Sequence, residues 1–252
     1  MAKLLSGISI DEIPPAPKDY CYDLHSPDVF WPRMYFVLKS LATNPSSMLF
    51  EHKKFLADDL SVHFQSSAVG VTFALLKINY LIRTTVGCIA KNRNVDCVYL
   101  TKWGKVLASE FGFNVVENDL DRIHTYRPSL YSLCCGRIAH FAYLCRKCDI
   151  PVEVAPQIET KQPPDLLVGN EKRWVYVSKD RILAHEYVKS HFEGIPDDQP
   201  VGFVLMIPTM RKKLMAICER YGFSATFTDV ETLIDNEQML PKDNQLWFSS
   251  NL

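Results

Sequence analysis

The hydrophobic pattern of the chain changes near residue 137, and this change limits the folds open to the chain more than any other feature. Before it, the pattern reads as helix, helix, two-stranded ribbon and helix. From 137 to 252, short apolar strands alternate with helices, which predicts an α/β domain with parallel pairings. The strands are expected at 151–159, 164–169, 173–180, 200–208 and 223–230, and the helices at 137–148, 181–194 and 209–222, the last closed by Gly222. A chain of 252 residues is long enough for two domains with separate cores.

The first part of the chain has the plan of a winged helix-turn-helix module. Prolines make residues 1–30 irregular, and we expect an arm lying on the surface of something else. Helices are predicted over 33–42, 46–64 (as one or two helices), 67–82 and 103–112, with ribbon strands at 86–90 and 97–101. The phrase Leu100-Thr101-x-x-Gly104 after the ribbon is common in such modules. We therefore expect a proline-rich arm and first helix over 1–45 and a winged helix-turn-helix domain over 46–125.

Positive charge gathers in this predicted module, although the net charge of the chain is only -1. Phosphate attraction needs such a local excess, which the total hides. We expect phosphate contacts from the basic side chains of the second helix, the ribbon and the third helix: Lys77, Arg83, Lys91, Arg93, Lys102 and Lys105. Thr72 and Asn79, on the predicted helix 67–82, are the candidate base-reading residues. The alternative is a mildly basic, solvated surface in a protein-interaction module.

The second part of the chain resembles restriction-endonuclease-like domains in one motif. Pro164-Asp165 opens a predicted strand and Lys179 closes the next one, as in the PD-(D/E)xK signature. That signature uses an Asp and a second acid to hold a divalent cation such as Mg²⁺, with Lys beside the attacking water. Here Val177 stands where the second acid belongs, and valine cannot bind Mg²⁺. We expect a restriction-endonuclease-like α/β domain over 126–252 that has lost cleavage; otherwise Asp165 and Lys179 are catalytic.

A group of cysteines lies in and near a predicted helix at 137–148. Cys134-Cys135 and Cys145-x-x-Cys148, with His140 between them, have ligand types that suit Zn²⁺. Cys145 and Cys148 share one helix face, however, and buried free cysteine is common in protein cores. We expect core packing and no metal or other cofactor, while the role of the group stays open.

Together the two parts resemble the replication-relaxation family of plasmid and mobile-element proteins. The resemblance covers about residues 50–210 and rests on three short motifs: Val98-Tyr99-Leu100-Thr101 with Gly104, Tyr126-Arg127-Pro128-Ser129-Leu130 leading into Ile138-Ala139-His140, and Pro164-Asp165. Members carry an N-terminal winged helix followed by a degenerate endonuclease-like domain. The resemblance implies double-stranded DNA binding in replication, mobilisation or transcriptional regulation of a mobile element.

Two other functions stay open at this point, as do the oligomeric state and the protein partners. One is a metal-dependent endonuclease, and the other is a protein-interaction subunit of a larger assembly with the arm threaded onto a partner. A replication or mobilisation protein is a candidate partner, and so is a second copy of the chain. We expect a cytoplasmic protein without a membrane span, because the sequence has no apolar run of about 18 residues and no signal-peptide pattern at its start.

Overall fold

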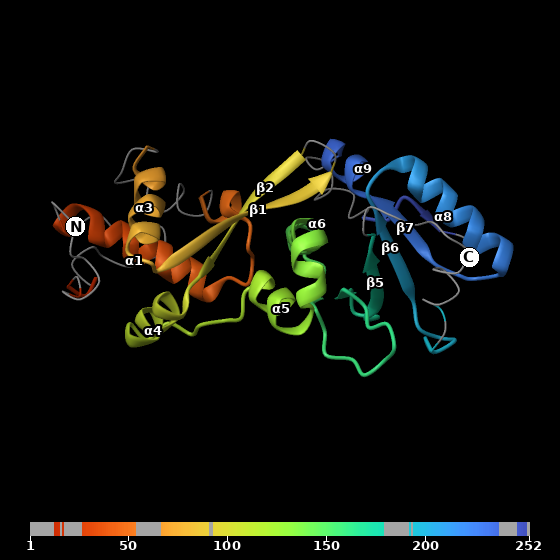
Figure 1. The fold of residues 1–252 in the computed structure, drawn as a ribbon, viewed down its shortest axis with the longest axis horizontal. Coiled ribbons are helices and arrows are strands. Elements are labelled where there is room, and N and C mark those ends of the chain that lie inside the picture. Colours follow the sequence, from red (N-terminus) through yellow and green to blue (C-terminus); the bar gives the residue numbers. More distant parts are fainter. Residues whose placement is uncertain are drawn as a thin grey trace. The chain divides into compact units, whose positions relative to one another are not determined.

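The computed structural model describes residues 13–15, 17, 27–53, 67–90, 93–178, 192, 194–236 and 246–250. Their contacts divide the chain into two compact units. Unit 1 holds the described residues up to Thr85 together with Asp96–Asn118, and unit 2 holds Val86–Val95 with the described residues from Asp119 onward. Helices and sheets both occur (Figure 1), so the predicted mixed α+β class is confirmed.

Unit 1 is built around three helices and the base of a two-stranded ribbon. The helices are α1 (Pro27–Thr43), α3 (Ser67–Ile78) and α4 (Lys102–Glu110), and the strands are β1 (Ile82–Ala90) and β2 (Arg93–Leu100). The first helix packs against both α3 and α4. Its buried Met34 and Leu38 share one apolar cluster with Leu76 and Leu107. The first helix therefore belongs to the core of unit 1, whereas the sequence placed it with a separate arm.

The described part of the N-terminal arm packs on unit 1 itself. Ile13 contacts the apolar cluster, and the indole Nε1 of Trp31 donates a hydrogen bond to the Pro14 carbonyl at 2.6 Å. The first helix begins at Pro27 instead of residue 33, so the irregular structure predicted for residues 27–30 is wrong. Proline suits the first turn of a helix, where its missing N–H leaves no bond unmade.

The second predicted helix is shorter than its apolar spacing indicates. It was expected over 67–82, but α3 ends at Ile78 and Ile82 already begins β1. Tyr80 has a left-handed backbone with φ 57°, and the N–H of Leu81 returns to the Leu76 carbonyl at 2.9 Å. This turn closes the helix in the way that a residue in the left-handed region usually does. Arg83 therefore lies on a strand.

A buried polar network ties the end of α1 to the segments beside it. His52 is fully buried; its Nδ1 lies 2.9 Å from the Ser40 hydroxyl and its Nε2 lies 2.9 Å from the Ser46 carbonyl. The amide of Asn118 donates to the same carbonyl at 2.8 Å, and the Ser47 hydroxyl donates to the amide oxygen of Asn118. Burial lowers the pKa of His52 below its ordinary value, because a desolvated imidazole resists taking up a proton.

Unit 2 contains a mixed six-stranded sheet in the order β3-β4-β5-β6-β7-β8. The strands are β3 (Val152–Val154), β4 (Leu166–Val168), β5 (Arg173–Val177), β6 (Val201–Leu205), β7 (Thr226–Asp229) and β8 (Ser249–Ser250). The three central strands β5, β6 and β7 pair in parallel, as predicted from the alternation of strands with helices. The outer pairings are antiparallel.

Helices cover this sheet and leave its central strand without solvent contact. The helices are α5 (Asp119–Tyr126), α6 (Pro128–Lys147), α8 (Pro208–Tyr221) and α9 (Val230–Asp235). The first two pack on each other, α6 also contacts β3, β4 and β5, and α8 lies along β6 and β7 (Figure 1). All of β6 is buried. Gly222, left-handed at φ 70°, closes α8 where the sequence predicted its end.

Among the described helices, none is both long enough and apolar enough to span a bilayer. The helix predicted over 181–194 lies outside the described residues, apart from positions 192 and 194, and so do residues 54–64 of the helix or helices predicted over 46–64. Lys91 and Lys179 also lie outside them.

We predict that His52 makes unit 1 less stable in mild acid. Its pKa is lowered in the folded chain, so below about pH 6.5 the unfolded chain binds a proton that the folded chain does not. The free energy of unfolding should therefore fall by up to about 1.4 kcal/mol per pH unit until the folded pKa is reached. Urea denaturation between neutral and acid pH measures this slope. It should flatten in His52→Gln but not in His124→Gln, whose side chain is exposed; equal slopes in both variants would contradict the prediction.

Candidate functional site

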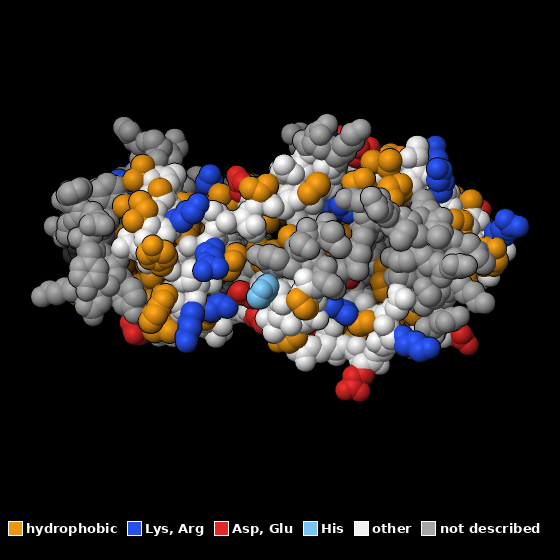
Figure 2. Space-filling model, viewed as in Figure 1, with side chains coloured by type: hydrophobic (Ala, Val, Ile, Leu, Met, Phe, Trp, Pro, Cys, Tyr) orange, Lys and Arg blue, Asp and Glu red, His pale blue; other side chains and the backbone are white. Residues whose placement is uncertain are grey.

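The predicted phosphate-contacting cations take different positions in the structure. Lys77 on α3, Arg83 on β1 and Lys102 on α4 are exposed, and among the described residues no acidic side chain forms an ion pair with them. Lys105 is half-buried. On the visible face of the part that carries α3, the base of the ribbon and α4, Lys and Arg side chains gather beside hydrophobic ones (Figure 2).

Arg93, predicted to contact phosphate from the ribbon, forms an ion pair with an acidic side chain of unit 2. Its guanidinium lies 3.5 Å from the Asp235 carboxylate, and both side chains are exposed. The second half of β1 is packed against α6, because a Cβ added to Gly136 of α6 would lie 2.6 Å from the carbonyl carbon of Gly87. Within the described residues, Arg93 therefore has an acidic partner in unit 2, unlike Lys77, Arg83 and Lys102.

The two predicted base-reading residues do not present their side chains on the exposed face of α3. Thr72 is fully buried, which corrects the prediction that it reaches DNA. The amide of Asn79 is half-buried and donates to the Leu75 carbonyl at 2.9 Å. The exposed face of α3 instead carries Val71 and Ile78 beside Lys77.

The first turn of α4 is held against the junction between α3 and β1. The Thr101 hydroxyl donates to the Tyr80 carbonyl at 2.6 Å and accepts from the Gly104 N–H at 3.1 Å, so it caps the helix. The Thr101 N–H donates to the Leu81 carbonyl at 3.0 Å. A Cβ on Gly104 would lie only 2.1 Å from that carbonyl oxygen. The phrase Leu100-Thr101-x-x-Gly104 thus needs threonine for the cap and glycine for the close approach.

Two aromatic residues at this junction were missed by the sequence analysis. Tyr80 is 77% exposed and Trp103 is 58% exposed. Tyrosine in the left-handed region costs on the order of 1–2 kcal/mol, which glycine or asparagine would largely avoid. The apolar spacing of residues 67–82 gave no sign of this turn. Together with Lys77, Arg83 and Lys102, these two aromatic residues form what we call the junction surface.

In unit 2, the structure brings together the two strands of the nuclease-like motif. Asp165 precedes β4 and is buried, and its Oδ2 accepts a hydrogen bond from the Val177 N–H at 2.7 Å. The position that would carry the second acid therefore lies beside Asp165, as the motif requires, but Val177 contributes only its backbone. Lys179 lies outside the described residues.

Arginine side chains approach the same ends of β4 and β5. Arg127, at the start of α6, donates to the Pro164 carbonyl at 3.0 Å. Burial lowers the pKa of Arg127, and the Asp165 carboxylate opposes that shift. Fully buried Arg137 donates to the Ser178 carbonyl. A divalent cation at Asp165 would have to displace a guanidinium charge and a backbone donor, so the described residues fit Mg²⁺ poorly.

Other acids and the cysteine group do not assemble a metal site in the described part of the chain. Glu153 forms an ion pair with Arg122 at 2.8 Å, and no group of three or more His, Cys, Asp or Glu side chains there is placed to hold a metal. The cysteines Cys134, Cys135, Cys145 and Cys148 are all buried. Burial raises the pKa of Cys145 and of Cys148, which keeps them as thiols, the form that suits a core.

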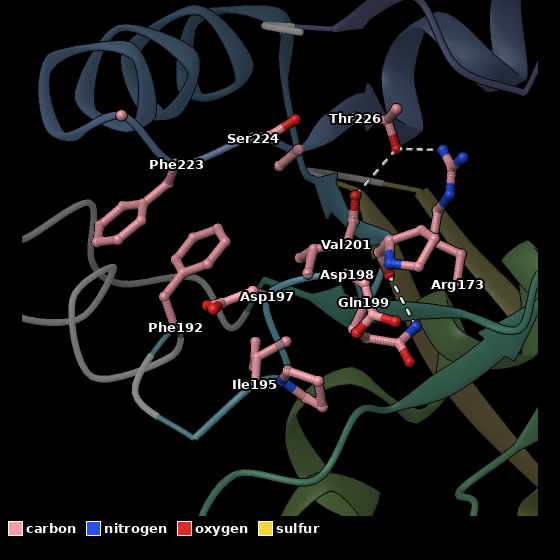
Figure 3. A pocket seen from close by; sticks show the side chains of 14 residues that line it. Arg173, Phe192, Ile195, Asp197, Asp198, Gln199, Val201, Phe223, Ser224 and Thr226 are labelled. Carbon is pink, nitrogen blue, oxygen red and sulfur yellow. Dashed lines mark hydrogen bonds between the residues drawn. The ribbon is translucent and has the colours of Figure 1, made fainter.

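A cavity of about 520 Å³ opens at the amino ends of the parallel strands of unit 2 (Figure 3). Phe192 and Phe223 stack with ring centroids 4.2 Å apart on one side. On the other, the Arg173 guanidinium donates to the Thr226 hydroxyl at 2.6 Å and lies over the Trp247 ring. These contacts make the guanidinium part of the wall, and we assign the cavity no ligand.

Comparison of the chain with protein-family models, with curated proteins and with solved structures gives no significant match.

We predict that Gly104→Ala destabilises unit 1 by about 1–3 kcal/mol, because the added methyl group meets the Leu81 carbonyl and the backbone must shift. Gly70→Ala is the matched control. Gly70 lies in α3 with open space around its added Cβ, so alanine there should stabilise by about 0.5–1 kcal/mol. Urea unfolding of both variants measures the two signs, and a neutral or stabilising Gly104→Ala would contradict the close approach.

We also predict that Asp165 stabilises unit 2 instead of binding metal. Removing its carboxylate in Asp165→Ala leaves the Val177 N–H without its acceptor, which should cost about 1–3 kcal/mol. Exposed Glu159→Ala should change stability by less than about 0.5 kcal/mol. Incubation of supercoiled plasmid with Mg²⁺ or Mn²⁺ tests the enzyme alternative. Nicking by the wild-type chain that vanishes in Asp165→Ala would support catalysis and overturn this assignment.

Proposed function

We propose that the chain is a DNA-binding protein whose unit 1 is a winged helix-turn-helix domain that contacts double-stranded DNA. The observation that carries the proposal is the set of exposed cations Lys77, Arg83 and Lys102 around the junction of α3, β1 and α4. Exposed cations unpaired within the described chain are available to neutralise phosphates and release counterions. The order of helices and ribbon strands in unit 1 supports the fold assignment.

The composition of the exposed α3 face suggests how the duplex is bound. Val71 and Ile78 offer apolar contact, which suits thymine methyl groups but carries little of the hydrogen-bond code of the major groove. Most of the affinity should therefore come from the phosphate backbone, with weak dependence on base sequence.

We further propose that unit 2 is a restriction-endonuclease-like domain without cleavage activity. Its helix, antiparallel strands β3, β4 and β5, and parallel β6 follow the order of such a core. The contact between Asp165 and Val177 supports the assignment of the motif, and the missing second acid argues against hydrolysis. A role in replication, mobilisation or regulation of a plasmid or other mobile element rests on the family resemblance. Sequencing of genomic fragments captured by the protein tests that role.

The triple variant Lys77→Ala, Arg83→Ala, Lys102→Ala tests the DNA-binding surface. Each lost phosphate contact should reduce the slope of log K against log salt by about 0.9, so the variant should lose a slope of about 2–3 and bind more than about tenfold more weakly. Fluorescence anisotropy with several duplex sequences, between about 50 and 200 mM salt, measures both changes.

The matched control removes the same amount of charge from unit 2, in Lys161→Ala, Lys172→Ala, Lys213→Ala, all three exposed. It should keep the wild-type salt slope. Equal loss in both triple variants, or no binding by the wild-type protein, would contradict a duplex contact through Lys77, Arg83 and Lys102.

A further inference from the structure

The junction surface carries two aromatic side chains that duplex binding through phosphates does not use. Tyr80 and Trp103 are 77% and 58% exposed, and Ile78, the last residue of α3, is 60% exposed. The hydrogen bond from the Thr101 hydroxyl to the Tyr80 carbonyl joins the two segments that carry the rings. Large apolar side chains grouped in this way on a surface generally mark a binding site.

The backbone at Tyr80 gives an independent reason to assign this ring a role. Its φ of 57° places it in the left-handed region, where glycine or asparagine would close α3 without strain. The tyrosine ring therefore adds nothing to the turn, and at 77% exposure it adds little to the core. Strained residues of this kind are concentrated at functional sites.

We propose that Tyr80 and Trp103 form a stacking platform for unpaired bases, so that unit 1 binds a duplex adjoining a single strand more tightly than a continuous duplex. This inference rests on the proposed DNA-binding function and specifies its substrate. Every base has a π-face, so stacking on aromatic side chains tolerates any sequence. The weak hydrogen-bonding capacity of the α3 face fits recognition of this kind.

Charge around the rings favours a nucleic acid over an apolar protein surface as the occupant. Lys77 precedes Tyr80 by less than one helical turn, Arg83 follows it on β1, and Lys102 is next to Trp103; all three are exposed. Aromatic side chains interleaved with cations are the usual composition of single-strand binding grooves, where the cations follow the backbone and the rings take the bases. An apolar partner would leave these ammonium and guanidinium groups to be desolvated.

The test compares three fluorescent DNA probes by anisotropy: a blunt duplex, the same duplex with a single-stranded extension, and the extension strand alone. The wild-type chain should bind the extended duplex at least about fivefold more tightly than the blunt one. Tyr80→Gly should remove this preference and leave blunt-duplex affinity within about twofold, because glycine accepts the left-handed turn and so preserves the fold. Trp103→Ala should also remove it, together with the quenching of tryptophan emission by the extended probe.

Tyr221→Ala is the matched control, since Tyr221 is an exposed tyrosine in unit 2, and it should keep the preference. Equal binding of blunt and extended duplexes by the wild-type chain would overturn the inference while leaving the proposed function standing. Absence of binding to any duplex would overturn both. Light scattering on the same samples tests the remaining possible occupant, a second copy of the chain. A wild-type dimer that becomes a monomer in Tyr80→Gly would assign the rings to that copy and overturn the stacking platform.

Discussion

The close approach of α4 to the carbonyl of Leu81 is the contact on which the junction surface depends. Glycine at position 104 lets the helix come within reach of that carbonyl, and the Thr101 hydroxyl then bonds both the end of α3 and the first turn of α4. This contact brings the start of α4, with Lys102 and Trp103, to the junction of α3 and β1, which carry Lys77 and Arg83.

The Asp165 region of unit 2 has contacts that do not suit a metal. The Asp165 carboxylate accepts from the Val177 backbone and lies beside the Arg127 guanidinium. These interactions satisfy a buried carboxylate without any cation from solvent. The segment at Asp165 therefore joins β4, β5 and the start of α6.

The sequence predicted the regular elements better than the surface. Alternating apolar strands located β4 to β7, and Gly222 marked the end of α8, because burial and left-handed turns leave strong local signals. The end of α3 was predicted too late, since Ile82 continues the helical spacing although it starts a strand. Thr72 was predicted at the surface from its polarity alone, although it lies on the buried face of α3. The roles of Tyr80 and Arg93 depend on a turn and on an ion pair with Asp235, neither of which has a signature in local sequence.

If unit 1 binds DNA as proposed, its exposed residues favour recognition of DNA structure over DNA sequence. Hydrogen-bond readout needs polar side chains on an exposed helix face, and α3 presents Val71 and Ile78 with Lys77 as its charged group. Phosphate contacts alone do not distinguish one site from another. What the junction surface adds to phosphate binding is a pair of exposed rings at a strained turn, and rings respond to whether a base is free to stack. A protein with this surface would find its site through the presence of unpaired bases next to a duplex, a feature that replication and strand processing both create.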